Sequence, residues 1–248
     1  MNNNLFAGKV FISLHEVDST NEQAKRWLSK NKPPEGAVIF THHQTKGKGQ
    51  FGKTWESEPG KNLTFSIILY PVFLEAKKAP TLNQAICLGL KDFLQSLNIP
   101  ARIKWPNDIY HHDKKLAGLL IENGLTGEHL NYSVTGIGLN VNQTNFSPDI
   151  PNPTSLKLIS GKEFELEKLL SEFFPFVEKR YLQLKSGRFA EIKKDFEGCL
   201  YQLNEERLYK TSTEKFEGII RGLNEEGQLA MEIRGKTKLF SNAEIIYL

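Results

Sequence analysis

Apolar runs typical of β-strands alternate along the chain with segments whose apolar residues recur at helical spacing. The strand-like runs predict strands at residues 9–14, 36–41, 62–72, 102–110, 116–122 and 130–138. Helical spacing predicts helices at residues 22–29, 81–97 and 165–187, with residues 188–197 continuing the last one. Pro106 interrupts the run at 102–110, which favours an edge strand or a bulge there. No internal repeat or low-complexity segment is present.

The pattern changes after Tyr201, where the strand-like runs become short and closely spaced. They lie at residues 207–213, 215–223, 228–233 and 237–240, and a turn ending in Gly227 separates the second from the third. Short strands at this spacing predict a small barrel of about forty residues. We therefore expect two domains, at residues 1–203 and 204–248.

A loop rich in glycine and lysine connects the predicted strands at 36–41 and 62–72. Glycine lets the backbone approach a ligand closely, and consecutive free N–H groups in such a loop form an anion-binding concavity. Lysine side chains add positive charge to the same place. The sequence therefore predicts a loop that wraps a phosphate-bearing ligand. The residues concerned are Gly47, Gly49 and Gly52 among Lys46, Lys48, Lys53 and Lys61.

The sequence gives poor support to three other kinds of site, namely a dinucleotide site, a protein-kinase site and a histidine metal site. The glycine spacing satisfies the dinucleotide-binding pattern, but Pro59 and Gly60 follow too soon for the helix that this pattern requires. A protein-kinase glycine loop also lies between strands, yet no His-Arg-Asp or Asp-Phe-Gly motif follows. The pairs His42–His43 and His111–His112 are adjacent residues, which point to opposite faces of a strand and are poorly placed to share a metal ion.

Composition narrows the class of protein further. The net charge of +3 is too small to indicate nucleic-acid binding by itself. No apolar run reaches the length of a transmembrane helix, and residues 1–9 contain no apolar signal core. Cys87 and Cys199 are isolated, which fits a reducing compartment. We therefore expect a cytoplasmic protein without a membrane partner.

Several short motifs have an ordinary explanation when each is taken alone. Residues 18–21 are all of helix-capping type, and Lys115 is explained as a solvated lysine in a turn. Their order along the chain, however, resembles that of the bacterial biotin protein ligases (biotin–[acetyl-CoA-carboxylase] ligase), over nearly the whole sequence. The motifs are Asp18-Ser-Thr-Asn21, Gln44 with Gly47–Gly52 and Trp55, Lys104-Trp-Pro-Asn-Asp108, Lys115-Leu-Ala-Gly118 and Gly136-Ile-Gly-Leu-Asn140.

This resemblance implies an α+β fold in which helices pack on a mixed or antiparallel sheet, as in class II synthetases, followed by a small SH3-like barrel. It implies a reaction in two steps. Biotin and ATP with Mg²⁺ form biotinyl-5′-AMP, and the biotinyl group then passes to one lysine of a biotin carboxyl carrier protein. The motifs begin within about twenty residues of Met1. We therefore expect no winged-helix DNA-binding domain and no DNA partner.

The resemblance also assigns roles to particular residues. Lys115, Lys48 and Asp108 are implied to be catalytic, with Asp108 as a Mg²⁺ ligand. A lysine suits this chemistry because it reduces the repulsion between a carboxylate and the phosphate that it attacks. Biotin binding is implied for Ser19, Thr20, Asn21, Gln44, Gly47, Lys48, Gly49, Gln50, Lys115 and Gly118. Nucleotide binding is implied for Gly49, Gln50, Trp55, Lys104, Asn107, Asp108, Lys115 and Asn140.

One residue departs from the family pattern. Many members carry arginine where this chain has Gln50, so Lys48 and Lys53 are expected to compensate in part for the missing charge. Two alternatives stay open, namely a lipoate protein ligase with the same fold and adenylate chemistry, and a nucleic-acid-binding module that uses the lysines between 46 and 61. The sequence leaves open the acceptor protein, the order of substrate binding and the oligomeric state, including a homodimer.

Overall fold

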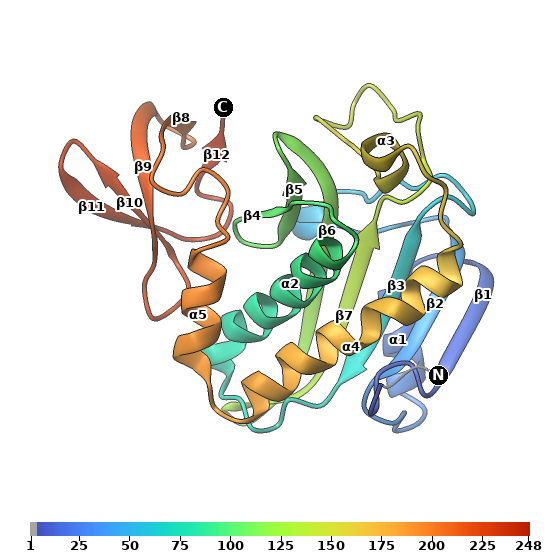
Figure 1. Cartoon of the computed structure of the whole chain (residues 1–248). Coiled ribbons are helices and arrows are strands. Elements are labelled where there is room, and N and C mark those ends of the chain that lie inside the picture. The colour runs from blue at the N-terminus through green and yellow to red at the C-terminus, as the bar shows by residue number, and fades with distance from the viewer. Residues whose placement is uncertain (1–3) are drawn as a thin grey trace.

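The structure, a computed structural model, describes residues 4–248. A seven-stranded sheet with the order β1-β2-β3-β7-β6-β5-β4 forms its centre (Figure 1). β1 and β2 are parallel and every other neighbouring pair is antiparallel, so the expected mixed sheet is confirmed. The strands are β1 (Phe11–Val17), β2 (Ala37–Gln44), β3 (Leu63–Leu69), β4 (Arg102–Lys104), β5 (Asp108–His111), β6 (Lys114–Thr126) and β7 (His129–Leu139).

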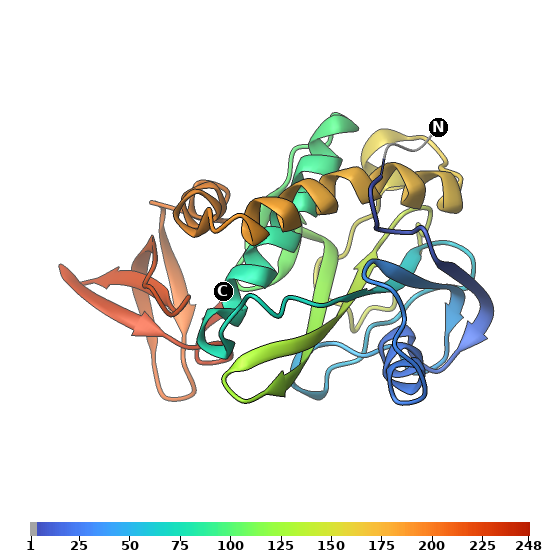
Figure 2. The same ribbon diagram turned by 90° about the horizontal axis from the view of Figure 1, so that it is seen from below.

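Helices cover both faces of this sheet, and the two faces differ in the polarity of their side chains. α2 (Ala79–Ser96), α4 (Leu166–Lys185) and α5 (Phe189–Glu197) lie on one side, whereas α1 (Thr20–Leu28) lies on the other (Figures 1 and 2). β3 shows why the faces differ, because Phe65 packs edge-on against Phe173 of α4 while the adjacent Ser66 turns to the α1 side. The larger apolar core therefore fills the first side, whereas the α1 side combines polar groups with a small apolar cluster around Ala24, Ile68 and Val134.

A second, five-stranded antiparallel sheet lies beside the first (Figure 1). Its order is β11-β10-β9-β8-β12, with β8 (Glu206–Lys210), β9 (Lys215–Leu223), β10 (Leu229–Ile233), β11 (Lys236–Phe240) and β12 (Ile246–Tyr247). The expected small C-terminal β-domain is confirmed, while the boundary at residues 203 and 204 stays a prediction. β12 was not predicted because two residues are too few to show a period.

Three sequence-based expectations need correction. The helix expected to run through 165–197 is two helices, because Gly187 adopts a left-handed conformation with φ of 79° between α4 and α5. The run at 102–110 forms two strands, β4 and β5, which pair with each other, and β4 is the edge strand that Pro106 favoured. Short helical segments were missed, namely η1 (Gln50–Gly52), η2 (Ala76–Lys78) and α3 (Leu156–Ser160).

The helix cap expected within residues 18–21 is confirmed in position, but it lacks a capping hydrogen bond from a side chain. The N-cap is Ser19, whose side chain makes no capping hydrogen bond, and the helix begins at Thr20. Thr20 and Asn21 are buried, and their side chains bond to other elements of the structure. These polar residues therefore connect α1 to the central sheet instead of capping the helix.

Candidate active site

The floor of the candidate site is formed by rows of residues that lie side by side across the central sheet, on the α1 side. Residues two apart on a strand share a face, so consecutive rows on this face come from alternate residues. The first row is Thr64, Gly138, Gly118 and Asp108, the second is Ser66, Gly136 and Leu120, and the third is Ile68, Val134 and Glu122. Residues from three separate motifs are thereby brought onto neighbouring positions.

A network of hydrogen bonds holds α1 over the second row. The backbone N–H of Thr20 donates to Gln44 Oε1 at 2.8 Å, and Ser66 Oγ lies 2.7 Å from Thr20 Oγ1. Ser66 Oγ also lies 2.6 Å from Asn21 Oδ1, while Asn21 Nδ2 donates to Glu122 Oε2 at 2.8 Å. Each buried polar group named here thus has a partner, as buried polar groups in stable proteins do.

Gly136 makes this arrangement sterically feasible. A Cβ atom at Gly136 would lie 2.4 Å from Asn21 Oδ1, which is closer than non-bonded atoms approach. The absence of a side chain in the second row therefore lets Asn21 reach across the sheet to β6. The predicted biotin-binding residues Thr20, Asn21 and Gln44 are brought together here, and Ser19 is buried at the start of the same helix.

Charged side chains line the outer edge of this network. Lys25 Nζ lies 2.7 Å from Glu22 Oε1 and 2.9 Å from Glu122 Oε1, and Lys48 Nζ of the glycine loop lies 2.6 Å from Glu22 Oε1. Hydrogen bonds from Lys25 and then Lys48 lower the pKa of Glu22. The structure thus ties Lys48 to α1, and its predicted catalytic role stays a prediction.

Trp55, at the end of the glycine loop, lies on the first row. Gly118 and Gly138 face each other in the β6–β7 pair. A Cβ atom at Gly138 would lie 2.3 Å from Trp55 Cε2, and one at Gly118 would lie 3.3 Å from Trp55 Cζ3. The two glycines therefore form a flat seat for the indole ring. Trp55 Nε1 is buried and has no hydrogen-bond partner among the described residues.

Lys115 and Asp108 meet beside this ring. Lys115 Nζ lies 2.7 Å from Asp108 Oδ2 and 5.7 Å from the centroid of the Trp55 ring. Both side chains keep about a quarter of their surface exposed, at 27% and 25%. The predicted catalytic pair is thus brought together, next to Gly118 and Trp55, at a position that a ligand can reach.

Lys104 lies at the junction with the C-terminal sheet. Its Nζ atom lies 4.8 Å from the ring centroid of Tyr110 and 4.6 Å from that of Tyr247 in β12. Burial lowers the pKa of Lys104, although Asp108, its neighbour in the β4–β5 pair, acts in the opposite direction. A residue predicted to bind nucleotide is therefore covered in part by the second sheet.

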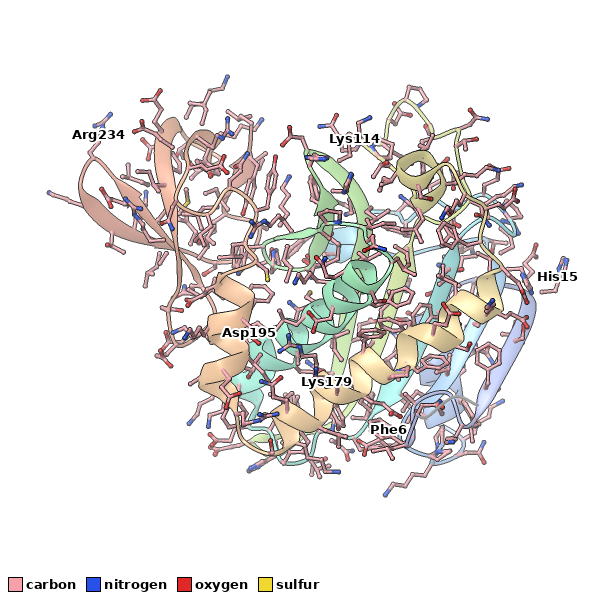
Figure 3. The ribbon with its side chains drawn as sticks, viewed as in Figure 1. Phe6, His15, Lys114, Lys179, Asp195 and Arg234 are labelled. Carbon is pink, nitrogen blue, oxygen red and sulfur yellow. The ribbon has the colours of Figure 1, made fainter. Side chains whose placement is uncertain are left out.

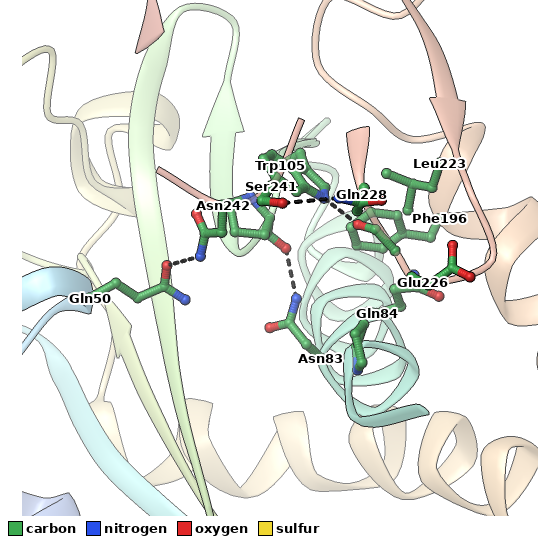
Figure 4. Close-up of a pocket in the computed structure, with 13 residues that line it drawn as sticks. Gln50, Asn83, Gln84, Trp105, Phe196, Leu223, Glu226, Gln228, Ser241 and Asn242 are labelled. Carbon is green, nitrogen blue, oxygen red and sulfur yellow. Dashed lines mark hydrogen bonds between the residues drawn. The ribbon is translucent and has the colours of Figure 1, made fainter. Parts of the chain in front are cut away.

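Most of the other predicted site residues make hydrogen bonds to the backbone or within it. The side-chain amide of Asn107 donates to the carbonyl of Leu119, and Asn140 Nδ2 donates to the carbonyl of Thr154 at 2.9 Å. Gly47 and Gly49 fold the loop onto itself, and Gly49 N donates to Lys53 O at 2.7 Å. Gln50 points toward the C-terminal domain, where its Oε1 accepts from Asn242 Nδ2 at 2.9 Å (Figure 4).

Several residues of the site were missed by sequence reasoning. Ser66 and Glu122 lie within strands, where nothing in the local sequence distinguishes them from other polar strand residues. Gly136 and Gly138 did carry a signal, because two glycines separated by one residue lie on the same face of a strand. Tyr247 and Asn242 lie in the C-terminal domain, and only the tertiary structure brings them to the site.

The residues fit a magnesium ion that is bound together with a phosphate ligand. Within residues 4–248, no three His, Cys, Asp or Glu side chains lie close enough to hold a metal ion without help. Mg²⁺ usually binds one or two carboxylates together with substrate phosphates and water, and Asp108 offers such a carboxylate. In the same range, no helix is long and apolar enough to cross a membrane.

Comparison with known proteins decides the family. The model of the biotin/lipoate A/B protein ligase family matches residues 14–140, about half of the chain. The chain belongs to this family. The resemblance inferred from the ordered motifs is thereby confirmed.

Individual family members are similar over almost the entire chain. The bifunctional ligase/repressor BirA of Bacillus spizizenii is 29% identical over 236 residues, which cover 93% of this chain and 72% of that protein. The biotin–[acetyl-CoA-carboxylase] ligase of Paracoccus denitrificans is 27% identical and covered over 99% of its length. The structure of a biotin protein ligase from Aquifex aeolicus in complex with biotin and ATP has a TM-score of 0.82 and 30% identity, covering 97% of this chain and 100% of that one.

Proposed function

We propose that this protein is an ATP-dependent ligase that activates biotin as biotinyl-5′-AMP and transfers the biotinyl group to one lysine of a biotin carboxyl carrier protein. The observation that carries the proposal is the juxtaposition of Lys115 and Asp108 with Trp55, on a glycine floor that continues into the hydrogen-bond network of α1. One end of this site offers neutral amides and hydroxyls, and the other offers charge.

The two ends suit the two ends of biotin. The ureido ring needs hydrogen-bond donors and acceptors, which the network around Thr20, Asn21 and Gln44 contains. The carboxylate then extends toward Lys115. Trp55, Gly118 and Gly138 offer an apolar surface between the two ends, which suits the thiophane ring and the alkyl chain.

The adenylation step brings two anions together, because the biotin carboxylate attacks the α-phosphate of ATP and pyrophosphate leaves. Lys115 lowers the repulsion between them and stabilises the negative charge that develops in the transition state. Asp108 holds Lys115 in position and is the residue that would bind Mg²⁺, which neutralises phosphate charge when it is bound. We assign Lys104, the neighbour of Asp108 in the β4–β5 pair, to the same phosphates.

The second step forms an amide bond. The ε-amine of the acceptor lysine attacks the acyl carbon of biotinyl-AMP, AMP leaves, and the amine releases a proton. An acyl-adenylate is readily hydrolysed, so the site must exclude water until the acceptor arrives. The glycine loop and Trp55 are the elements that we assign to this task. Such a reaction belongs in the cytoplasm, together with the carrier protein.

Mass spectrometry tests the proposal directly. We expect the protein, given biotin and ATP with Mg²⁺, to add one biotinyl group to the apo carrier domain of a bacterial acetyl-CoA carboxylase. A carrier domain in which the acceptor lysine is replaced by arginine is the matched control and should stay unmodified. Modification with lipoate instead of biotin would show that the substrate assignment is wrong, since the family contains both kinds of ligase.

A further inference from the structure

The backbone of Lys115 lies at a point where the central sheet becomes irregular. β7 ends at Leu139, whose partner in β6 is Ala117, so its strand pairing stops short of Lys115. On the other side of β6, the register with β5 shifts between Ile109 and Tyr110. Regular strand pairing alone therefore does not fix the backbone of this lysine.

A short segment outside the ordered motifs supplies the missing pairing. Residues 151–154, which we call the strap, lie between β7 and α3 (Figure 1). The N–H of Lys115 donates to the carbonyl of Asn152 at 2.7 Å, and the N–H of Thr154 donates to the carbonyl of Lys115 at 2.9 Å. Pro153 thus lies opposite Lys115 in a parallel bridge, at the one position where a missing N–H is harmless. The strap thereby pairs with both main-chain polar groups of Lys115.

The strap is anchored in the interior at its C-terminal end. Thr154 is only 4% exposed, and its carbonyl accepts from Asn140 Nδ2 at 2.9 Å. The N–H of Leu156 donates to the carbonyl of Asn140 at 3.1 Å. Buried hydrogen bonds hold a main chain in place, because breaking one leaves an unsatisfied polar group. The strap therefore connects Lys115 to a fixed point just beyond the end of β7.

Asn152 has a backbone conformation that few side chains tolerate. Its φ is 49°, in the left-handed region, which asparagine adopts more readily than β-branched residues do. The side chain of Asn152 is exposed, whereas its main-chain carbonyl makes the bond to Lys115. Glycine at this position would keep both the conformation and the bond, but valine would strain them.

We propose that the strap positions Lys115 for adenylation and that Asn152 sets the conformation of the strap; this inference rests on the proposed function. Lysine has a flexible four-carbon stem, so a fixed backbone narrows the positions that its amine can take. Nζ of Lys115 already lies 2.7 Å from Asp108 Oδ2, and in the reaction it must meet two anionic groups. The strap acts through Lys115 and does not touch the reacting atoms.

Two substitutions at one position test the proposal in the full-length chain. Asn152→Val strains the left-handed conformation without removing a charge, and Asn152→Gly is the conservative variant that keeps it. Asn98→Val is the matched control, because Asn98 is also exposed and has a φ of 59°, but it follows α2 and is not part of the strap. For each protein, pyrophosphate release with biotin and ATP with Mg²⁺ is measured together with the melting temperature.

For Asn152→Val we expect kcat for pyrophosphate release to fall about ten- to hundredfold, because a misplacement of about 1 Å can cost a factor of this size. The KM for biotin should change little, since the network at the α1 end is untouched. Asn152→Gly should keep most of the wild-type rate. Asn98→Val should keep all of it, although its melting temperature falls about as far as that of Asn152→Val.

Pro153→Gly is a second variant, which loosens the strap without straining it and keeps the test valid if Asn152→Val does not fold. It should lower kcat in the same direction, by a smaller factor. The double variant Lys115→Ala/Asn152→Val should be no slower than Lys115→Ala alone, because the strap acts only through this lysine.

A further loss of rate in the double variant would overturn the proposal, because the strap would then act on the nucleotide directly. Wild-type kcat in both Asn152→Val and Pro153→Gly would also overturn it while leaving the ligase function intact. Absence of pyrophosphate release and biotinylation in the wild type would instead refute the proposed function.

Discussion

The two ends of the candidate site are held in different ways. At the α1 end, buried amides and hydroxyls bond to one another across long stretches of chain, such as Asn21 to Ser66, which are 45 residues apart. At the other end, Lys115 and Asp108 are partly exposed and bond mainly to each other. The first end is organised before any ligand arrives. In the proposed function, the second would exchange its internal ion pair for contacts with phosphate.

The two ends should also differ in how much their interactions contribute to the stability of the fold. A buried hydrogen bond that loses its partner leaves an unsatisfied group and costs about 1–3 kcal/mol of stability. A partly exposed ion pair contributes little to stability, typically about 0–1 kcal/mol. Substitutions at the α1 end should therefore affect folding and binding together, whereas substitutions at the charged end should affect the reaction and spare the fold.

Lys115→Ala should produce the largest effect. We expect pyrophosphate release to fall about 10²- to 10³-fold, the usual result of losing one electrostatic contact to the transition state. The melting temperature should change little, because the Lys115–Asp108 pair is partly exposed. Pyrophosphate assays and thermal denaturation measure the two quantities.

Lys114→Ala is the control for this prediction, because Lys114 is an exposed neighbour at the outer tip of the β5–β6 hairpin (Figure 3). It should retain the wild-type rate. Pyrophosphate release at the wild-type rate in Lys115→Ala would remove Lys115 from the catalytic group.

Asn21→Ala should lower the stability of the fold as well as the affinity for biotin, in contrast to Lys115→Ala. It removes one of the partners of Ser66 Oγ and of Glu122, together with one donor to the carbonyl of Leu120. We expect a loss of about 1–3 kcal/mol in the free energy of unfolding and a raised KM for biotin. Denaturant titration and steady-state kinetics measure these effects. Gln23→Ala, on the same helix but partly exposed, should leave both nearly unchanged, and a fully stable Asn21→Ala protein would contradict the preorganised network.

Glu22→Gln should have a smaller effect that depends on pH. The pKa of Glu22 is lowered from 4.5 by hydrogen bonds from Lys25 and Lys48, so its ionised form stabilises the folded state. This contribution is present above the unfolded-state pKa and is lost as the pH falls through the lower folded-state pKa. The wild type should therefore exceed Glu22→Gln by less than about 1 kcal/mol near neutral pH, with a smaller difference below pH 4. A difference that grows on acidification would contradict this sign.

Sequence reasoning was most successful where a motif carries its own geometry. The ordered motifs singled out Lys115, Asp108, Trp55 and Gly118, and the structure brings these four residues together. It failed where an ordinary residue acquires its role from a distant partner. Glu122 and Ser66 are unremarkable strand residues until α1 is placed over them, and the capping interpretation of Thr20 and Asn21 overlooked this alternative set of partners.

The C-terminal domain limited sequence reasoning in another way. Its strands were predicted from their period, but the period says nothing about docking. Tyr247 covers Lys104, and Trp105 Nε1 donates to Gly227 O at 3.1 Å, across the junction between the two sheets. Contacts of this kind depend on the orientation of one domain against the other, which no local pattern contains.

The smallest effect is expected for Gln50→Ala, which tests whether the C-terminal domain steadies the charged end of the site. Gln50 is bonded to Asn242 rather than to Lys115, so its loss should free the glycine loop without removing charge. One exposed amide–amide bond contributes about 0.5–1.5 kcal/mol, and exposure favours the lower figure. Trypsin cleavage after Lys48 and Lys53 should therefore quicken about two- to threefold.

A double-mutant cycle sharpens this test. If the two side chains act only through their mutual bond, Asn242→Ala alone should quicken cleavage as much as Gln50→Ala, and the double variant should add nothing further. Additive effects would mean that position 50 acts through another partner, such as the phosphate of the adenylate. In that case Gln50→Arg should slow the release of biotinyl-AMP, because an arginine adds a charged, forked donor. The cycle therefore decides whether Gln50 belongs to the charged end of the site or to the domain junction beside it.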